Sequence, residues 1–245
     1  MIILGDIGNT ETKICLVKNN KIIKKILIPS LGKKIRILNK YFKKFNFSKV
    51  EKILFCSVVP ITFKEFKNYF RKKTSIKCNE LKELNLRSIL KIDVNYKQVG
   101  SDRLANAIGV SDKNKNFIIL DFGTATTFDV LIGKNYKGGI ISPGINLSLS
   151  TLSDKASLIP KINLKKISKV IGKDTMSAVR SGFFWGYAGL IDNIINLIKK
   201  ETKKSFKVVI TGGFSKLFKN SIKAKVKQDF DITINGLIKA AKLIK

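Results

Sequence analysis

Residues 117–127 read FIILDFGTATT, which is an apolar run, then Asp-x-Gly, then hydroxyl side chains. Such a run predicts a buried β-strand that ends in an Asp-x-Gly turn. The chain opens on the same plan, because residues 2–10 read IILGDIGNT. In both places a second apolar stretch and a polar turn follow, at residues 14–21 and 128–135. The sequence therefore predicts two related halves, each beginning with a strand, a turn and a second strand.

Each half also contains a later apolar run that ends in a turn. Residues 53–60 read ILFCSVVP, and residues 208–213 read VVITGG. Both runs are short enough to be strands inside a sheet. We expect these strands to lie beside the opening strand of their own half.

Helical patterns separate the predicted strands. One runs from Arg103 to Val110, and a longer apolar one from about Ser177 to Ile198, whereas Gly138 to Gly144 is typical of a turn-rich connection. Strands alternating with helices indicate an α/β fold. We place the boundary between two domains before the second opening strand, giving residues 1–115 and 116–245, and expect them to face each other across a cleft.

The chain is strongly basic, with 48 Lys and Arg against 17 Asp and Glu, a net charge of +31. A basic surface attracts polyanions. The lysines are nevertheless spread along the chain, and no zinc-finger, helix-turn-helix or RNA-binding signature accompanies them. We therefore expect nonspecific attraction to polyanions and no specific nucleic-acid partner.

The cysteine and histidine content indicates the cellular compartment and limits which residues could act as a general base. Cys15, Cys56 and Cys78 are an odd number at wide spacing, which does not indicate a disulfide framework and fits a reducing cytoplasm. No apolar run is long enough for a signal peptide or a membrane span, so we expect no membrane partner. Because the chain has no histidine, any general base must be a carboxylate.

The first Asp-x-Gly turn is a candidate phosphate site. Gly8 lets the backbone approach an anion closely, and the Asn and Thr side chains that follow can donate hydrogen bonds. Asp6 could serve such a site by holding Mg²⁺ or its water shell. The alternative is an ordinary hairpin in which Asp and Gly only satisfy turn geometry.

The second turn, at Asp121, strengthens the first. Two such turns on equivalent strands are suited to holding a triphosphate from both sides. Thr126 or Thr127 could instead be present simply because threonine favours strands.

Gly100 to Arg103 reads GSDR and precedes an apolar-periodic helix. A carboxylate at a helix N-terminus is favoured in its ionised form, so Asp102 could accept a proton near neutral pH. Arg103 offers a fork that matches a substrate carboxylate. The alternative is that Asp102 caps the helix and Arg103 is a surface residue.

These motifs occur in the order typical of one enzyme family. DIGNT at 6–10, SVVP at 57–60, GSDR at 100–103, DFGTATT at 121–127 and TGG at 211–213 together resemble the type III pantothenate kinases, over essentially the whole chain. The resemblance implies two related actin-like, ribonuclease H-like domains flanking a nucleotide cleft, as in the acetate kinase, sugar kinase, Hsp70 and actin superfamily.

The resemblance also implies an activity. It is the ATP-dependent phosphorylation of pantothenate to 4'-phosphopantothenate, the first step of coenzyme A biosynthesis, with Mg²⁺ and a monovalent cation, K⁺ or NH₄⁺. Asp102 would accept the proton from the pantothenate hydroxyl, and Asp121 would hold the monovalent cation. The residues implied to contact ATP are Asp6, Ile7, Gly8, Asn9, Thr10, Glu11, Thr12, Lys13 and Thr124. Those implied to bind pantothenate are Gly100, Ser101, Asp102, Arg103 and Thr175.

The chain departs from the family pattern at two of these places. Ser101 stands where the family often has Ala, and Asp93 stands where it commonly has Tyr, which leaves one substrate contact without its usual side chain. Thr175 could also be an ordinary helix cap. Gly182, Gly186 and Gly189 indicate a helix that approaches a neighbour or a second subunit closely, and the family resemblance implies a homodimer.

Three other functions remain open from the sequence. The chain could be a nucleotide-binding regulator of the same fold without catalytic activity. It could be a polyanion-binding module that uses its positive charge, or a kinase for a different alcohol. ATP-dependent ADP release with pantothenate would separate these hypotheses.

Overall fold

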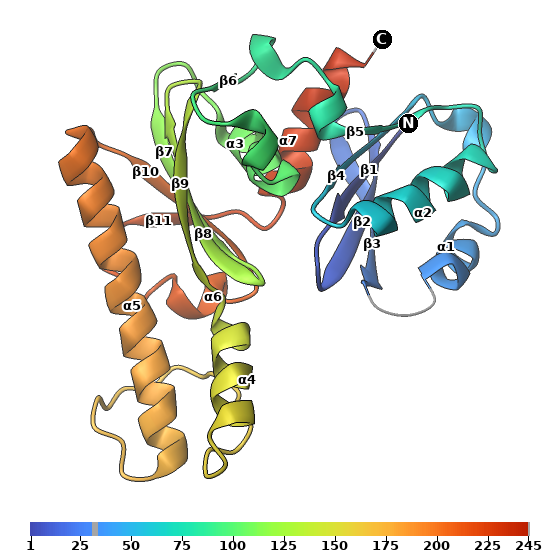
Figure 1. Cartoon of the computed structure of the whole chain (residues 1–245). Coiled ribbons are helices and arrows are strands. Elements are labelled where there is room, and N and C mark those ends of the chain that lie inside the picture. Colours follow the sequence, from blue (N-terminus) through green and yellow to red (C-terminus); the bar gives the residue numbers. More distant parts are fainter. Residues whose placement is uncertain (31–33, 245) are drawn as a thin grey trace. The chain divides into compact units, whose positions relative to one another are not determined.

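The computed structural model describes residues 1–30 and 34–244, and its elements are labelled in Figure 1. The chain forms two compact units, neither of them contiguous in sequence. Unit 1 consists of Met1–Ser111, Lys134–Tyr136 and Asp231–Lys245. Unit 2 consists of Asp112–Gly133 and Lys137–Phe230.

Unit 1 is built on a sheet in the order β3-β2-β1-β4-β5. The strands β1, β2 and β3 form an antiparallel meander, while β4 and β5 join it in parallel. The turn between β2 and β3 places Asn19 and Asn20 at φ 51° and 59°, a region that asparagine tolerates better than most residues. The strands are β1 (Ile2–Ile7), β2 (Glu11–Lys18), β3 (Lys21–Pro29), β4 (Lys52–Ser57) and β5 (Cys78–Glu80).

An apolar core fixes this sheet against its helices. Phe55, Phe66 and Phe70 are fully buried, with ring centroids of Phe55 5.8–6.0 Å from the other two. A Cβ on Gly5 would lie 1.9 Å from the Phe55 ring, so β1 needs glycine where this ring crosses it. The helices of this region are α1 (Lys34–Phe42) and α2 (Pro60–Arg71), with short 3₁₀ helices at Phe47–Lys49, Leu81–Glu83, Leu86–Ser88 and Tyr96–Gln98.

Two helices far apart in sequence complete unit 1. They are α3 (Ser101–Val110) and α7 (Ile232–Ala240), the second followed by a 3₁₀ turn at Ala241–Leu243. A Cβ on Gly236 would lie 1.9 Å from the Ala105 carbonyl oxygen, so the two backbones touch. A buried hydrogen bond of 2.7 Å from the Thr233 hydroxyl to Asn106 Oδ1 also joins them. The last helix is therefore part of the unit that carries the first motif.

Unit 2 repeats the plan of unit 1. Its sheet runs β11-β10-β7-β8-β9, with β7 antiparallel to β8 and parallel to β10. The first two residues of β9, Asn135 and Tyr136, belong to unit 1 and pair there with the short strand β6 (Lys91–Ile92). The strands are β7 (Asn116–Phe122), β8 (Ala125–Ile132), β9 (Asn135–Pro143), β10 (Lys207–Gly212) and β11 (Val226–Gln228).

Helices cover the sheet of unit 2 with an apolar layer. The long helix α5 contributes Phe184, Ile191 and Ile195 to a core shared with Ile118 and Ile210 of the sheet. The Phe218 ring of α6 lies between the Phe122 and Phe184 rings, at centroid distances of 5.4 and 5.6 Å. The helices are α4 (Ile145–Lys155), α5 (Thr175–Thr202) and α6 (Ser215–Phe218).

The two sheets confirm the predicted α/β class and the predicted repeat. In each, the opening strand is central, pairs antiparallel with the strand that follows and parallel with the later one. The helix predicted from Arg103 begins two residues earlier, at Ser101, and the one predicted from about Ser177 begins at Thr175.

One interpretation was wrong. Gly138 to Gly144 is not a turn-rich connection, because most of it belongs to β9. Gly138 has φ 113°, a conformation that glycine allows without steric cost, so the strand continues through it.

The compact units also differ from a cut at 115/116. That division would place residues 231–245 with the second half, whereas in the structure α7 packs on α3 of unit 1. The two sequence halves, 1–115 and 116–245, stay a prediction about which segments repeat each other.

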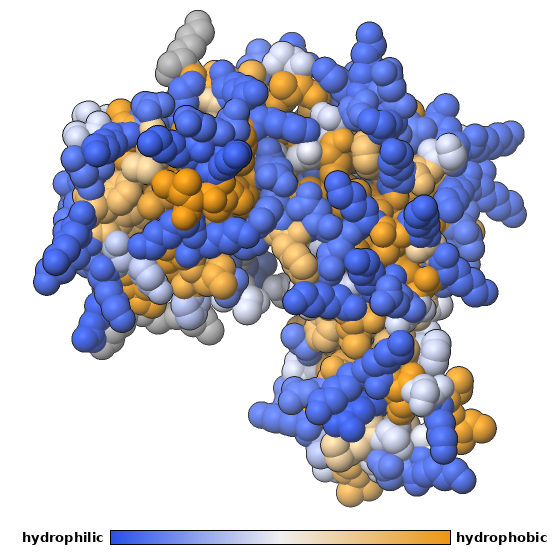
Figure 2. All heavy atoms as spheres, turned by 180° about the vertical axis from the view of Figure 1, so that it is seen from behind, coloured by the Kyte–Doolittle hydropathy of each residue, from blue (hydrophilic) through white to orange (hydrophobic). Residues whose placement is uncertain are grey.

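Polar side chains cover most of the surface that Figure 2 shows, with smaller apolar areas between them. Exposed large apolar side chains include Leu158, Val170 and Ile171 in the segment before α5. No helix within residues 1–30 and 34–244 is long and apolar enough to cross a membrane.

Candidate functional site

The first Asp-x-Gly turn lies at the end of β1, the central strand of unit 1. Asp6 is half-buried there, opposite Lys13 on β2 and Cys56 on β4. The Gly8 amide donates to the Glu11 carbonyl at 3.0 Å and closes the turn. Asp6 therefore stands where three strands meet, directly before a tight turn with an exposed tip.

The tip of this turn is held from β3. The Ser30 hydroxyl donates to the Gly8 carbonyl at 2.7 Å, and the Ser30 amide donates to the Thr10 carbonyl at 2.9 Å. Asn9, Thr10 and Glu11 remain exposed. No local pattern indicates that Ser30, 22 residues away from Gly8, would hold the turn.

Two of the residues implied to contact ATP have buried side chains. Ile7 and Thr12 are both 0% exposed, in the core of unit 1. They could approach a nucleotide only through their backbone. The exposed side chains of Asn9, Thr10 and Glu11, and the half-buried side chains of Asp6 and Lys13, are the ones available to a ligand.

The Cys56 thiol is buried beside Asp6 and is affected by the charges of three carboxylates. The thiol donates to Asp6 Oδ1 at 3.5 Å. Burial raises the pKa of Cys56 well above its usual range, and the negative charges of Asp6, Asp102 and Glu80 add to the effect. Asp6 and Asp102, distant in sequence, both act electrostatically on this thiol of unit 1.

Asp102 occupies the first turn of α3. Its Oδ1 accepts a hydrogen bond of 2.8 Å from the Arg103 amide, and a Cβ on Gly100 would lie 2.5 Å from that same oxygen. Burial raises the pKa of Asp102 above its ordinary value, while the Arg103 amide and guanidinium act in the opposite direction. The helix end alone had suggested a carboxylate held in its ionised form, but burial is the larger effect.

Gly100, Ser101 and Arg103 lie beside this carboxylate. Ser101 is buried, 2% exposed, and Arg103 is half-buried. Gly100 is the N-cap of α3 and supplies no side-chain cap. The residues implied to bind pantothenate in unit 1 are therefore contiguous around Asp102, and the cap interpretation of Asp102 is replaced by a position inside the first turn.

Glu80 is a polar residue of this region that the sequence analysis missed. It ends β5, and its carboxylate accepts hydrogen bonds from Ser101 Oγ, from the Ser57 amide at 3.3 Å and from the Lys82 amide at 2.5 Å. Burial raises its pKa, and these hydrogen bonds lower it. A single Glu at the end of a three-residue strand carries no local signal that it will reach two separate segments, at Ser57 and Ser101.

The second Asp-x-Gly turn has the equivalent place in unit 2. Asp121 is half-buried near the end of β7, opposite Thr127 on β8 and Thr211 on β10. Gly212 has φ 83°, and a Cβ on it would lie 2.7 Å from Asp121 Oδ1. The same Cβ would lie 2.5 Å from the Phe122 carbonyl oxygen, so only glycine fits between the Phe122 backbone and the Asp121 carboxylate.

The threonines of the second turn divide into two kinds. Thr124 is exposed at the tip of the turn, where a Cβ on Gly144 would come within 2.1 Å of its carbonyl oxygen. Thr126 is 0% exposed, so the strand-forming interpretation holds for it. Only Thr124, and the half-buried Thr127, could present a hydroxyl to a ligand.

Thr175 is the first residue of α5 and is exposed. The cap of this helix is its neighbour Asp174, whose Oδ1 accepts 2.8 Å from the Ser177 amide in a capping box. Thr175 belongs to unit 2, whereas Gly100 to Arg103 belong to unit 1. Asp121 and Thr124 share the Asp-x-Gly turn at the end of β7, whereas Thr175 lies on a separate element at the start of α5.

Asp93, which stands in the place of the family's tyrosine, has a structural position. Its amide donates to the Tyr136 carbonyl at 3.0 Å beside the pairing of β6 with β9. Its carboxylate lies 3.8 Å from Lys91 Nζ. A carboxylate paired in this way does not reproduce the contact of a phenol.

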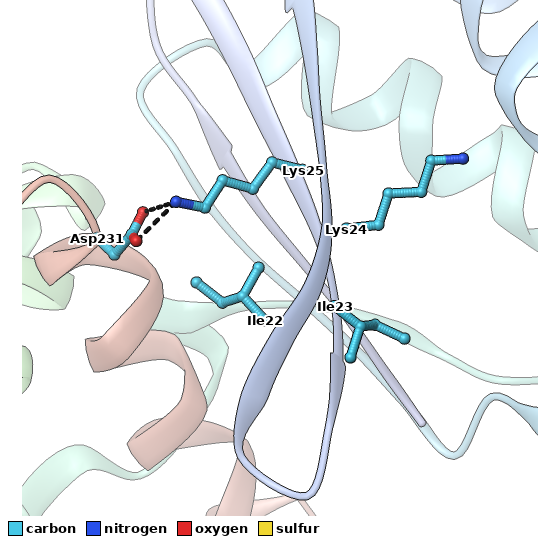
Figure 3. Close-up of a pocket in the computed structure, with 5 residues that line it drawn as sticks. All are labelled: Ile22, Ile23, Lys24, Lys25 and Asp231. Atoms are coloured by element: carbon cyan, nitrogen blue, oxygen red, sulfur yellow. Dashed lines mark hydrogen bonds and ion pairs between the residues drawn. The ribbon is translucent and has the colours of Figure 1, made fainter.

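A surface hollow lies elsewhere in unit 1, on β3 and at the start of α7. Figure 3 shows Lys25 directed at Asp231, with Nζ 2.6 and 2.7 Å from its two carboxylate oxygens. The other residues that line it are Ile22, Ile23 and Lys24. This hollow contains none of the implied site residues.

A metal ion bound to this chain would have only one or two ligands from His, Cys, Asp or Glu side chains within the described residues. Among residues 1–30 and 34–244, no three His, Cys, Asp or Glu side chains group closely enough to hold a metal ion. The single carboxylates of Asp6 and Asp121 are hard oxygen donors of the kind that Mg²⁺ and other hard cations prefer. Both fit a cation whose other ligands are phosphate, water or backbone oxygens.

The chain is similar to proteins of one family. Residues 2–197 match the family model described as type III pantothenate kinase. A type III pantothenate kinase of Pelagibacter ubique is 65% identical over 250 residues, covering 100% of both chains. One of Maricaulis maris is 38% identical over 201 residues, covering 81% of this chain and 78% of its own.

The fold is also found in a solved structure at low identity. A protein of Sinorhizobium meliloti, assigned as a 2-dehydro-3-deoxygalactonokinase, superposes with a TM-score of 0.63 at 10% identity, covering 100% of this chain and 99% of that one. At this identity the likeness concerns the fold alone. It agrees with the predicted actin-like architecture of two related α/β domains.

Proposed function

Because this chain belongs to the type III pantothenate kinase family, we propose that it transfers the γ-phosphoryl group of ATP to pantothenate with Asp102 as the general base. The product is 4'-phosphopantothenate, and the reaction opens coenzyme A biosynthesis. The observation that carries the proposal is the full-length identity of 65% to a relative of this name, combined with a half-buried carboxylate in the first turn of α3.

Asp102 receives the proton of the attacking hydroxyl. The new bond joins the hydroxyl oxygen to the γ-phosphorus, and the bond that breaks joins the γ-phosphorus to the β–γ bridging oxygen, which leaves with ADP. A carboxylate whose pKa is raised by burial is a stronger base than an exposed aspartate, so the upward shift of Asp102 supports this role. Positioning and charge neutralisation supply the rest of the rate in phosphoryl transfer.

The two Asp-x-Gly turns bind the nucleotide in this proposal. Asn9 and Thr10 at the exposed tip of the first turn, and Thr124 at that of the second, donate to phosphate oxygens. Of the other residues carried over from the family, Ile7, Gly8 and Thr12 contribute backbone only, while Glu11 and Lys13 contribute side chains.

The carboxylates of Asp6 and Asp121 serve the cations. Asp6 would hold Mg²⁺ through its water shell, and Asp121 a monovalent cation, K⁺ or NH₄⁺. The glycine at 212 supports the second assignment, because any side chain there would fill the space beside Asp121 Oδ1. When bound, the cations neutralise phosphate charge.

Pantothenate binds at the start of α3. Gly100, Ser101 and Arg103 line its site, the Arg103 guanidinium pairs with its carboxylate, and Thr175 contributes a hydroxyl. A planar fork of donors suits a carboxylate better than a single ammonium would. Asp93 contributes no contact of the tyrosine kind.

The protein acts as a homodimer in the cytoplasm. Gly182, Gly186 and Gly189 support the dimer, since a Cβ on any of them would meet nothing within 4 Å of its own chain. Trp185, on the same helix, is 37% exposed. The three cysteines are free and buried, which fits a reducing compartment. Light scattering of wild type and Gly186→Leu tests the dimer, which predicts a smaller mass for the variant.

A coupled assay of ADP release tests the function. Wild type is given ATP with pantothenate or with a panel of other small alcohols, with and without K⁺. Pantothenate-dependent ADP release that needs K⁺ supports the proposal. ATP binding without pantothenate-dependent release would instead identify a nucleotide-binding regulator, and release with another alcohol would identify a different acceptor.

A further inference from the structure

Side chains of the segment from Glu80 to Lys82 form hydrogen bonds with residues on both sides of Gly100. On the far side, the Glu80 carboxylate accepts from Ser101 Oγ. On the near side, Lys82 Nζ donates to the Val99 and Lys97 carbonyls, both at 3.1 Å. Asp102 immediately follows Ser101, the residue bound by Glu80.

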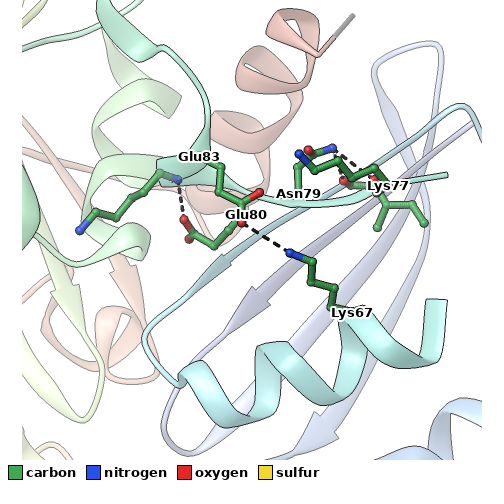
Figure 4. Close-up of polar contacts among 7 residues, drawn as sticks. Lys67, Lys77, Asn79, Glu80 and Glu83 are labelled. Carbon is green, nitrogen blue, oxygen red and sulfur yellow. Dashed lines mark hydrogen bonds and ion pairs between the residues drawn. The ribbon is translucent and has the colours of Figure 1, made fainter. Parts of the chain in front are cut away.

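The Lys82 side chain is itself held in place. Its Nζ lies 5.1 Å from the centre of the Tyr96 ring, and the Tyr96 hydroxyl donates to the Lys82 carbonyl at 2.9 Å. The Glu80 carboxylate in turn accepts from the Lys82 amide at 2.5 Å, in the region shown in Figure 4. The hydrogen bonds on the two sides of Gly100 therefore belong to one connected network.

The N-cap residue of α3 contributes no side chain of its own. This residue is Gly100, which makes no side-chain cap hydrogen bond. Ser101 is 2% exposed and Val99 is 7% exposed, so both of these residues lie inside the unit. The place of the first turn of α3, and with it that of the Asp102 carboxylate, depends on contacts from outside the helix.

We infer that Glu80 and Lys82 are positioning residues for Asp102, and that they set the distance from its carboxylate to the substrate hydroxyl. The inference rests on the proposed function, since it assigns these two residues a part in the same reaction. Neither residue is within the GSDR motif. We therefore expect their effect on the rate to act through the position of Asp102. A displacement of about 1 Å at a catalytic group can lower the rate by about 100-fold.

The main test uses Glu80→Ala and Lys82→Met in the full chain, each measured for kcat and for the KM of both substrates. We expect kcat to fall by about 10- to 100-fold, with the KM for ATP changed less than about 2-fold. Glu80→Gln, which keeps the shape and an acceptor oxygen, should recover most of the rate.

Glu83→Ala is the matched control. Glu83 belongs to the same 3₁₀ helix, but its carboxylate lies 3.7 Å from Lys67 Nζ and contacts neither side of Gly100. Figure 4 shows Lys67 and Glu83 beside Glu80. The control should keep the wild-type kcat.

The Asp102→Asn background separates positioning from a merely structural role. If Glu80 acts through Asp102, Glu80→Ala should leave the residual kcat of Asp102→Asn unchanged. A structural role would lower that residual kcat by the same factor as in wild type. An equal factor in both backgrounds, or a kcat for Glu80→Ala equal to that of Glu83→Ala, overturns the inference.

The kinetic results distinguish a failure of the proposed function from a failure of the positioning role. Wild type without pantothenate-dependent ADP release defeats the proposed function. Wild type with that activity, together with unaltered kcat in Glu80→Ala and Lys82→Met, defeats only the positioning role. If Glu80→Ala does not fold, Glu80→Gln and Lys82→Met in the two backgrounds decide the question.

Discussion

At the scale of single residues, Asp102 serves catalysis at a cost to the fold. Its pKa is raised above the ordinary value of 3.8 by burial, so the folded state favours the protonated form. The stability that this shift contributes is fully present below pH 3.8 and is lost as the pH rises through the folded-state pKa. At neutral pH the ionised carboxylate therefore destabilises unit 1.

Asp102→Asn should separate the two effects. We expect kcat to fall by about 10²- to 10⁴-fold, the usual contribution of a general base. ATP affinity should stay within about 2-fold, and the melting temperature at pH 7 should stay the same or rise, because the buried charge is gone. Steady-state kinetics, calorimetric ATP titration and thermal denaturation measure the three quantities. An unaltered kcat would remove Asp102 from the role of base.

The rate should also depend on pH through the same carboxylate. Because only ionised Asp102 accepts a proton, kcat should fall as the pH drops through its raised pKa, at a higher pH than an exposed aspartate would require. The measurement is kcat from pH 5 to 9 with circular dichroism at each pH as a control for folding. A profile that is flat across the folded range contradicts the assignment.

Residue positions were predictable where a local pattern stated them. The two Asp-x-Gly turns and the GSDR helix start could be read from the sequence, because a turn or a helix end is set by neighbours along the chain. The hydrogen bond from Ser30 to the first turn and the one from Ser101 to Glu80 could not be predicted, since each joins segments about twenty residues apart. The upward pKa shift of Asp102 likewise comes from burial, which a helix N-terminus does not reveal.

At the scale of elements, the contact between α3 and α7 decides where Asp102 lies. The contact is backbone to backbone at Gly236, and a buried Thr233–Asn106 hydrogen bond adds to it. Small residues at such a crossing allow an approach that any Cβ would prevent. Nothing in a single helix pattern indicates which distant helix it will touch.

Gly236→Ala should therefore loosen unit 1. The new methyl group would lie 1.9 Å from the Ala105 carbonyl oxygen, and we expect a loss of about 1–3 kcal/mol in the free energy of unfolding, as for overpacked cores. Urea denaturation measures it. Gly182→Ala is the control, because its methyl group meets nothing within 4 Å and alanine favours helices. Equal stability of Gly236→Ala and wild type would contradict the close packing.

Strand β9 shows that a local pattern can also predict a turn where the structure has none. Gly138 and Gly139 suggested turns, and yet β9 runs through both. Pairing within a sheet outweighs the weak strand preference of glycine, and the φ of 113° at Gly138 is one that only glycine takes easily. The repeated strand order was predictable because both halves state it in the same sequence pattern.

At the scale of the whole molecule, the two compact units interleave along the chain. Unit 1 takes its last helix from Asp231–Lys245, after unit 2 has been completed. Lys52 Nζ reaches the Ala241 carbonyl at 3.2 Å and also donates to the Ile244 carbonyl, tying that end to β4. A contiguous cut of the sequence could not have anticipated this, because the last apolar helix matches either sheet equally well.

Removal of residues 231–245 should unfold unit 1 and leave unit 2 folded. Deletion exposes the apolar face of α3 and removes Leu237 and Ile234, both fully buried, from the core. Limited proteolysis with mass spectrometry should find cleavage sites throughout residues 1–111 and protection of residues 137–230. Protection of both units to the same degree as in wild type would show that α7 is dispensable.

The late arrival of α7 has a consequence for synthesis on the ribosome. Chains are synthesised from the N-terminus, so every residue of unit 2 is made before the final helix that α3 requires. Until then Ser101 of the GSDR turn can form its hydrogen bond with Glu80, but the helix against which α3 packs is missing. Newly made chains should therefore leave the apolar face of α3 exposed until synthesis is complete, which is the stage at which a nascent-chain chaperone would find them.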